Sequence, residues 1–406
     1  MKRLTLTISS LTLALGLCSP AVLAERLAVL ADKVHTQAGP VIERGVVVIH
    51  QGKIEQVGRQ SDIRLPAGTR TLQAAEVTPG LIDARTVVGL AGYLNQPHDQ
   101  DQLETSTAMQ PQLRAFDAYN SRERLVDWLR SLGVTTLHTG HGPGALISGQ
   151  TMLIKTQGNN VDAGMLKPLS MIVAQLGPGA FGAENRSPGT RAKQMAMLRQ
   201  QLMKASEYRD KQGDGDKAPA RDLELEALAE VLAGRTPLLI TAYREQDIHS
   251  ALRLAEEFSI PVVLDGAAEA YLAIDAIKAA GVPVILHPTM ARQFGELENA
   301  SFTSAQQLHA AGIPFALQSG YERYVPKTRV VLWEAAMAAA YGLPPEVALG
   351  SITIEAAKIL GLDDRIGSLE PGKDADLVLY NGDPFEYSSR VTTVIINGEV
   401  VSDTAH

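Results

Sequence analysis

The sequence has little of what marks a disulfide-rich or nucleic-acid-binding protein. Only one of its 406 residues is cysteine, so no disulfide can form within the chain. Aromatic residues make up 5%, too few for a platform that stacks nucleic-acid bases. Lys and Arg number 37 against 45 Asp and Glu, the formal net charge is −8, and no long basic run occurs. We therefore expect no nucleic-acid partner, because such proteins neutralise phosphates with an excess of basic residues.

Apolar residues, in contrast, are abundant enough for a large core. They make up 45% of the chain. At about 100–200 residues per domain, the length predicts two domains, or one large α/β barrel with an accessory layer. The 35 glycines and 21 prolines are spread without a period, which excludes collagen-like and low-complexity classes.

The first 24 residues predict a secretory signal peptide. Two basic residues precede the apolar stretch 4–17, and Val22-Leu23-Ala24 offers a cleavage site. We expect cleavage after this site, a periplasmic location, and no stable membrane insertion afterwards. One alternative is an uncleaved anchor, although the apolar run is short for a spanning helix. Another is lipidation of Cys18, which follows a weak lipoprotein-box pattern.

The chain alternates between β-rich ends and a middle of strand–helix units. Residues 27–82 and 366–402 contain short β-branched runs separated by turns, including the hairpin signal Asn397-Gly398. Residues 83–345 alternate apolar runs of four to six residues with amphipathic helical stretches. Such units predict a parallel sheet buried on both faces. We therefore expect an α/β protein, with a TIM-type (β/α)₈ barrel and a small β-sandwich built from both termini.

Two motifs at the ends of the predicted barrel carry a family resemblance. Residues 77–84 read Val-Thr-Pro-Gly-Leu-Ile-Asp-Ala, and residues 367–377 read Gly-Ser-Leu-Glu-Pro-Gly-Lys-Asp-Ala-Asp-Leu. Both resemble the amidohydrolase superfamily, most closely its imidazolonepropionase-like branch, and the similarity covers roughly residues 27–401. The resemblance implies a metal-dependent hydrolase fold that acts on non-peptide carbon–nitrogen bonds with zinc or another divalent metal.

The metal-ligand positions that this resemblance implies hold other residues. The His-x-His pair falls on Arg85 and Val87, the histidines of the fifth and sixth strands fall on Thr241 and Asp265, and the catalytic aspartate of the eighth strand falls on Gly320. Only Asp265 could still bind a metal, and Arg85 is a permanent cation. A catalytic zinc needs about three protein ligands. We therefore expect a degenerate metal site and no bound cofactor.

Other residues are candidate ligand-binding groups. His138 and His141 have a His-x-x-His spacing after the second barrel strand, and His287 ends a later one. A polar ligand-binding role, a structural role and a rebuilt metal site with Asp265 are alternatives for these histidines. Lys155 is the nearest candidate for the family's bridging lysine, although it lies in a predicted hairpin.

Arg85 and Asp265 predict a further arrangement at the barrel mouth. Because the strand ends of such a barrel converge on one pocket, we expect an ion pair between them that fills the vacated metal site. Two functions fit these features: an exported hydrolase of non-peptide carbon–nitrogen bonds with a degenerate metal site, or an inactive barrel that serves as a periplasmic ligand-binding or scaffolding protein. Either would take a small molecule as substrate or ligand, and the fold does not choose between them.

Overall fold

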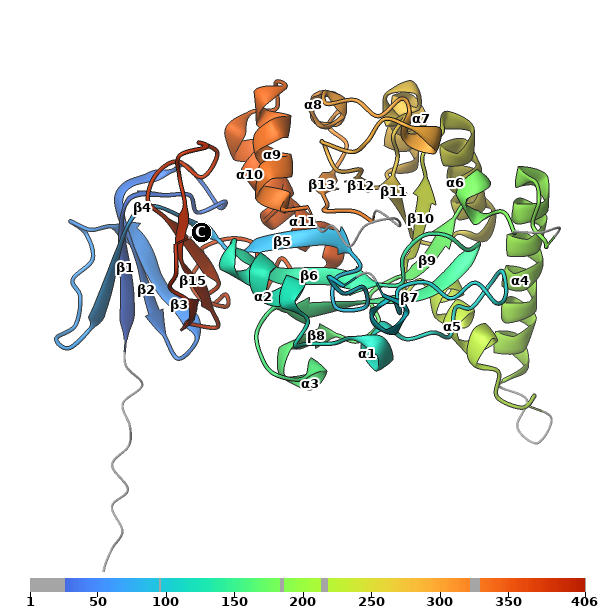
Figure 1. Ribbon diagram of the computed structural model, residues 1–406, viewed down its shortest axis with the longest axis horizontal. Coiled ribbons are helices and arrows are strands. Elements are labelled where there is room, and N and C mark those ends of the chain that lie inside the picture. Colours follow the sequence, from blue (N-terminus) through green and yellow to red (C-terminus); the bar gives the residue numbers. More distant parts are fainter. Residues whose placement is uncertain (1–25, 95, 183–185, 213–217, 322–328, 406) are drawn as a thin grey trace, which may run out of the picture.

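The computed structural model describes residues 26–94, 96–182, 186–212, 218–321 and 329–405 (Figure 1). The predicted signal peptide lies outside these residues. A sheet built from the blue and red ends of the chain lies at the left of Figure 1, and the strand–helix units lie to its right. None of the described helices combines the length and the apolar composition of a membrane span.

The first sheet combines strands from both ends of the chain. Its strands are β1 (Leu27–Val34), β2 (Ile42–His50), β3 (Lys53–Arg59), β4 (Arg70–Pro79), β14 (Leu377–Tyr380), β15 (Val391–Ile396) and β16 (Glu399–Ser402). They run in the order β16-β15-β14-β4-β1-β2-β3, and β4 joins β14 in antiparallel pairing. Asn397 and Gly398 have φ of 51° and 78°, as a tight turn between β15 and β16 requires. The hydrogen bonds form one continuous sheet where the sequence predicted a sandwich.

The second sheet curves into a nearly closed barrel. In chain order its strands are β5 (Leu81–Thr86), β6 (Val134–Gly140), β7 (Ile147–Lys155), β8 (Met165–Lys167), β9 (Ile172–Gln175), β10 (Leu238–Ala242), β11 (Val262–Gly266), β12 (Val284–Leu286) and β13 (Phe315–Leu317). The path runs from β5 to β13, with β8 paired to β7 off this path. Where β13 meets β5, Gly320 N–H donates to the Arg85 carbonyl at 3.2 Å.

One strand departs from the predicted all-parallel barrel. β7 is antiparallel to both of its neighbours, β6 and β9, whereas the other neighbouring pairs along the path are parallel. The connection between Gly140 and Ile147 is too short for the crossover helix that a parallel pair needs. The last residue of β7 therefore lies at the opposite end of the barrel from the last residues of the other strands.

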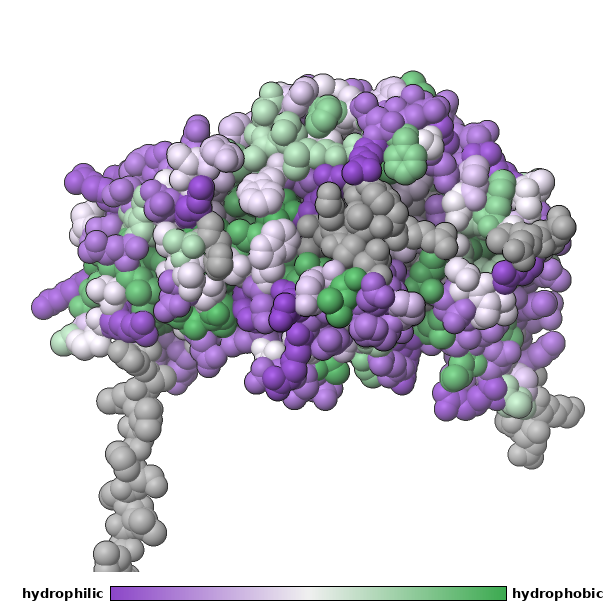
Figure 2. Space-filling view, in the orientation of Figure 1, coloured by the Kyte–Doolittle hydropathy of each residue, from purple (hydrophilic) through white to green (hydrophobic). Residues whose placement is uncertain are grey.

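Helices cover the outside of the barrel (Figure 1). They are α1 (Ala115–Ala118), α2 (Arg124–Ser131), α3 (Val161–Gly164), α4 (Arg191–Lys211), α5 (Leu223–Leu232), α6 (Glu245–Phe258), α7 (Ile274–Ala280), α8 (Ser304–Ala311), α9 (Val331–Ala340), α10 (Pro345–Ser351) and α11 (Ile354–Leu360). α6 illustrates why they pack there: Ile248, Ala251 and Leu252 share one face and are buried. The face drawn in Figure 2 is mostly hydrophilic, and its apolar residues form separate patches.

Alternate residues of the barrel strands belong to two different cores. In β10, Leu239 packs inside the barrel, whereas Leu238 and Ile240 pack between the sheet and the helices. Successive side chains of a strand point to opposite faces, so this alternation decides which residues reach the interior. At the carboxyl ends of the strands, the same alternation directs polar side chains to the barrel mouth.

Candidate functional site

A cavity of about 420 Å³ opens at the carboxyl ends of the parallel barrel strands. Active sites of such barrels lie at this face, and the volume suits a small molecule. Its polar lining includes Arg85, Asp265, His287 and Gln318, and its apolar lining includes Pro143, Ala291, Phe294, Leu297 and Tyr321. Of the residues predicted from the metal-ligand positions, Arg85, Val87, Asp265 and Gly320 line this cavity.

The register of the strands explains why these side chains meet. Val263 of β11 and Ile285 of β12 lie inside the barrel, and Asp265 and His287 follow each of them by two residues. Residues two apart share a face of a strand, so both polar side chains face inward. Thr241 follows Leu239 in the same way and reaches Asp265 rather than the cavity wall.

The Asp265 carboxylate is held by two neutral donors. The Thr241 hydroxyl donates to one oxygen, and Gln318 Nε2 donates to the other at 2.7 Å. Gln318 was not predicted from the sequence. Its signal was its place at the end of the last barrel strand, two residues before Gly320, where an inward side chain is expected.

Arg85 occupies an irregular position at the end of β5, where the pairing with β6 shifts register. Its side chain is 2% exposed. Nη1 donates to the Thr86 carbonyl at 2.9 Å and Nη2 donates to the His141 carbonyl, while Nε has no acceptor within the described chain. Burial lowers the pKa of Arg85, and the nearby Asp265 carboxylate opposes that shift.

The direct ion pair predicted between Arg85 and Asp265 is not formed among the described residues. The physical reason is that other hydrogen-bonding groups compete for both side chains. Backbone carbonyls take both Nη groups of the guanidinium, and Thr241 and Gln318 take both oxygens of the carboxylate. The two charges therefore line one cavity without direct contact.

His287 lines the same cavity, and one of its ring nitrogens is buried without a partner in the described chain. The residue is 1% exposed, and its Nδ1 lies 2.8 Å from the Pro288 carbonyl. Because a carbonyl only accepts hydrogen bonds, Nδ1 carries the proton and Nε2 carries a lone pair. Nε2 has no partner in the described ranges. Burial lowers the pKa of His287, so the ring is neutral near pH 7.

The other two predicted histidines lie outside the lining of this cavity. His138 is fully buried, with Nδ1 2.7 Å from the Ala84 carbonyl and Nε2 2.7 Å from the Thr151 hydroxyl. Burial lowers the pKa of His138 to about 3 and that of His141 to about 4. Both ring nitrogens of His138 are used within the protein, which favours the structural role among the alternatives for this residue, whereas the ring nitrogens of His141 have no partner in the described chain.

Lys155 also lies away from the mouth. It is the last residue of the antiparallel β7, so it sits at the opposite end of the barrel. Its Nζ is buried between Asp374 at 2.7 Å and Asp376 at 2.9 Å, and it also donates to Asn397 of the terminal sheet. Lys155 therefore joins the barrel to the terminal sheet and does not bind ligand at the mouth. β9, the strand before β10, ends at Gln175, so no lysine stands at the end of that strand.

Gly320 is fixed as glycine by its surroundings. Its φ is +76°, which favours glycine, and an added Cβ would lie 2.7 Å from Pro288 Cγ. No side chain fits at this position of the mouth without a shift. Over the residues that the structure describes, no group of three or more His, Cys, Asp or Glu side chains could hold a metal ion.

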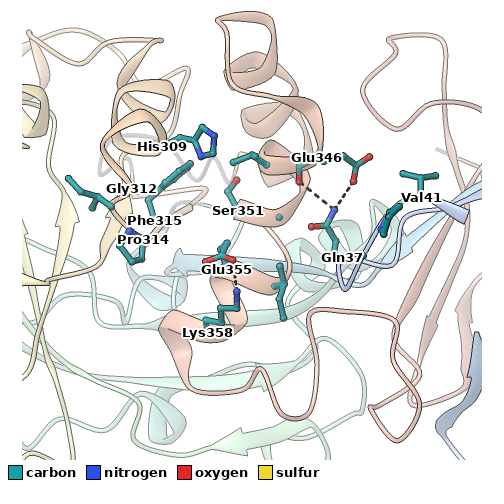
Figure 3. A pocket seen from close by; sticks show the side chains of 16 residues that line it. Gln37, Val41, His309, Gly312, Pro314, Phe315, Glu346, Ser351, Glu355 and Lys358 are labelled. Carbon is teal, nitrogen blue, oxygen red and sulfur yellow. Dashed lines mark hydrogen bonds and ion pairs between the residues drawn. The ribbon is translucent and has the colours of Figure 1, made fainter. Parts of the chain in front are cut away.

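A second cavity of about 570 Å³ lies at the other end of β13 (Figure 3). Several of its polar groups pair with one another: Lys358 pairs with Glu355 at 2.7 Å, and Gln37 Nε2 donates to Glu346 at 3.0 Å. The first cavity, in contrast, contains buried polar atoms without partners in the described chain. It is therefore the candidate active site.

Comparisons with known proteins agree with this architecture. The model of the amidohydrolase family matches residues 321–401. Over 89% of its length, the chain is 25% identical to amidohydrolase tasK of Hapsidospora irregularis, and it spans 40% of that protein. It is 24% identical, also over 89% of its length, to the imidazolonepropionase of Paracoccus denitrificans, of which it covers 95%. The crystal structure of an amidohydrolase from Thermotoga maritima MSB8 matches with a TM-score of 0.87 and 28% identity, covering 93% of this chain and 100% of that one.

Proposed function

We propose that the chain, which belongs to the amidohydrolase superfamily, hydrolyses a non-peptide carbon–nitrogen bond of a small molecule in the cavity at the barrel mouth. Three features support this proposal. Its relatives are named amidohydrolase and imidazolonepropionase. The cavity lies at the face where barrels of this type carry their active sites. Its volume of about 420 Å³ is in the range of small-molecule sites.

Members of this superfamily use divalent metals such as zinc, and the donor set of this mouth does not fit such an ion. Arg85 is a permanent cation, Val87 has no lone pair, and Gly320 has no side chain. Asp265 is one carboxylate, whereas a catalytic zinc needs about three protein ligands. We therefore propose that hydrolysis proceeds without the metal centre of the relatives. The observation that carries this proposal is the buried guanidinium of Arg85, fixed in the cavity by two backbone carbonyls.

Activity and metal dependence are tested together on the purified protein. A panel of N-acyl amines and cyclic imides is incubated with the enzyme, with and without dipicolinate as chelator. We expect turnover of at least one member, at a rate that neither dipicolinate nor added zinc changes. Hydrolysis abolished by the chelator would mean that other residues have rebuilt a metal site. Binding of panel members without turnover would instead support the inactive ligand-binding barrel.

Export is a further part of the proposal. The pattern of residues 1–24 supports a signal peptide and a periplasmic location. The test is the intact mass of the protein isolated from its native cells. We expect a mass that lacks residues 1–24. A chain that retains Met1, or one that carries a lipid on Cys18, would contradict the proposal.

A further inference from the structure

We propose that His287 and Arg85 supply the two functions that a metal supplies in the relatives. His287 activates the attacking water, and Arg85 stabilises the oxyanion that forms on the substrate carbonyl. The inference rests on the proposed hydrolase function, for which it provides the chemistry. The substrate class that fits is a small amide or imide, whose carbonyl oxygen accepts from Arg85.

His287 has the state that a general base needs. Its Nδ1–H is committed to the Pro288 carbonyl, which leaves the lone pair on Nε2. The side chain lines the cavity, is 1% exposed, and has no partner for Nε2 in the described chain. A buried polar atom without a partner is destabilising, so such an atom on a residue that lines a cavity points to a ligand or a water. His287 directly follows β12, the strand after the one that carries Asp265, and it is none of the positions at which the family resemblance implies a metal ligand.

Arg85 has the state that an oxyanion donor needs. Its two Nη groups are fixed to the carbonyls of Thr86 and His141, so the guanidinium is held before substrate arrives. Its Nε–H has no acceptor in the described chain and belongs to a buried cation that lines the cavity. Donors that are fixed in advance in a low-dielectric site stabilise developing negative charge strongly.

Asp265 keeps this arrangement intact. It balances the buried positive charge of Arg85, and Thr241 and Gln318 hold its oxygens so that it forms no direct pair with the guanidinium. The Nε–H of Arg85 is therefore left without an acceptor in the described chain. Asp265 is a positioning residue, because it acts through Arg85.

The chemical step balances with water alone. Nε2 of His287 takes a proton from water as the water oxygen bonds to the carbonyl carbon. The π electron pair of the carbonyl moves onto its oxygen, which accepts a hydrogen bond from Arg85 Nε–H. The carbon–nitrogen bond then breaks as His287 gives its proton to the leaving nitrogen. The products are a carboxylic acid and an amine, and both residues return to their starting states.

The experiment uses 4-nitroacetanilide, an activated amide that releases coloured 4-nitroaniline, with dipicolinate present throughout. The variants are His287→Gln, which removes the imidazole base but keeps a polar side chain of similar length, and Arg85→Lys, which keeps the charge but loses Nε–H. We expect His287→Gln to lower kcat by about 100-fold or more with little change in KM, and to abolish the solvent deuterium isotope effect. We expect Arg85→Lys to lower kcat by about 100-fold. His309→Gln, at the second cavity, is the matched control and should retain the wild-type rate.

The possible outcomes separate this inference from the function on which it rests. Thermal unfolding of each variant first shows that it is folded. A folded His287→Gln protein with kcat within about threefold of wild type would overturn the role of His287, while hydrolysis itself would stand. A wild-type protein that turns over neither 4-nitroacetanilide nor any member of the substrate panel would overturn the proposed function, and this inference with it.

Discussion

The ring of His35 joins the terminal sheet to α10 of the barrel region through Glu346. Its Nδ1 lies 2.8 Å from Glu346 Oε1, and its Nε2 lies 2.7 Å from Glu76 Oε2 on β4. Carboxylates only accept hydrogen bonds, so both contacts are satisfied together only when the ring carries two protons. Lys33 also pairs with Glu76, and Gln37 donates to Glu346. A charged imidazolium therefore bridges two acidic groups at this boundary.

This bridge predicts a pH-dependent stability. Burial alone would lower the pKa of His35, but the hydrogen bonds to Glu346 and Glu76 outweigh it and raise the pKa above 6.5. The stabilisation is therefore complete below pH 6.5 and is lost as pH rises through the raised pKa. Because Glu346 is half exposed, we expect His35→Gln to cost on the order of 1 kcal/mol at pH 5.5 and little at pH 9. Urea unfolding at both pH values measures this, with His309→Gln as control. An equal loss at both would contradict the bridge.

We expect replacement of the buried cation Lys155 to lower the stability of the protein more than replacement of His35. Lys155→Met removes the cation that pairs with the buried carboxylate of Asp376, whereas Asp374 keeps its ion pairs with Lys53 and Arg365. Loss of one partner of a buried pair costs about 3–5 kcal/mol. The control Lys358→Met breaks the more exposed pair with Glu355 and should cost about 1 kcal/mol or less. Denaturant unfolding of the two variants compares them. Similar losses would show that the Lys155 cluster contributes little to holding the terminal sheet on the barrel.

We expect that the aspartate implied by the family resemblance cannot be placed at position 320 without a loss of stability. Gly320→Asp places a Cβ 2.7 Å from Pro288 Cγ at a residue with φ of +76°. We expect a loss of about 1–3 kcal/mol from backbone strain, with more from the steric overlap. Gly189→Asp is the control, because nothing lies within 4 Å of its added Cβ and its φ is ordinary. Equal melting temperatures of the two variants would refute the steric explanation.

Restoring part of the ligand set should also fail. We expect Arg85→His combined with Val87→His to bind no catalytic zinc, because Thr241 and Gly320 would still lack ligand groups. The double variant also loses the guanidinium that Asp265 faces, so its stability should fall. Zinc-dependent hydrolysis by this variant, measured with and without dipicolinate, would contradict the expectation.

Much of the architecture could be predicted because burial leaves a local signature in the sequence. Runs such as 238–242 and 262–266 are mostly apolar and are buried on both faces, as strands covered by helices must be. The hairpin predicted around Lys155 agrees with the antiparallel pairing of β6 and β7. The predicted all-parallel barrel did not include such a strand, because a buried strand reads the same in parallel or antiparallel pairing.

For the candidate site, strand register predicts which side chains face the barrel mouth, but it does not predict their hydrogen-bond partners. Asp265 and His287 face the mouth because each lies two residues after an inward apolar residue. The partners of these groups depend on tertiary contacts. Gln318 takes one oxygen of Asp265, and a backbone carbonyl 56 residues from Arg85 takes part of its guanidinium. Charge alone predicted a direct Arg85–Asp265 pair, and these neutral partners prevent it.

Zinc titration by isothermal calorimetry tests the central claim most directly, namely that the barrel mouth is built around Arg85 rather than around a metal. The protein is first dialysed against dipicolinate, and the chelator is then removed. We predict no saturable binding with one or two ions per chain, and an unchanged rate of 4-nitroacetanilide hydrolysis across the titration. Stoichiometric zinc binding accompanied by a rise in hydrolysis would contradict the claim.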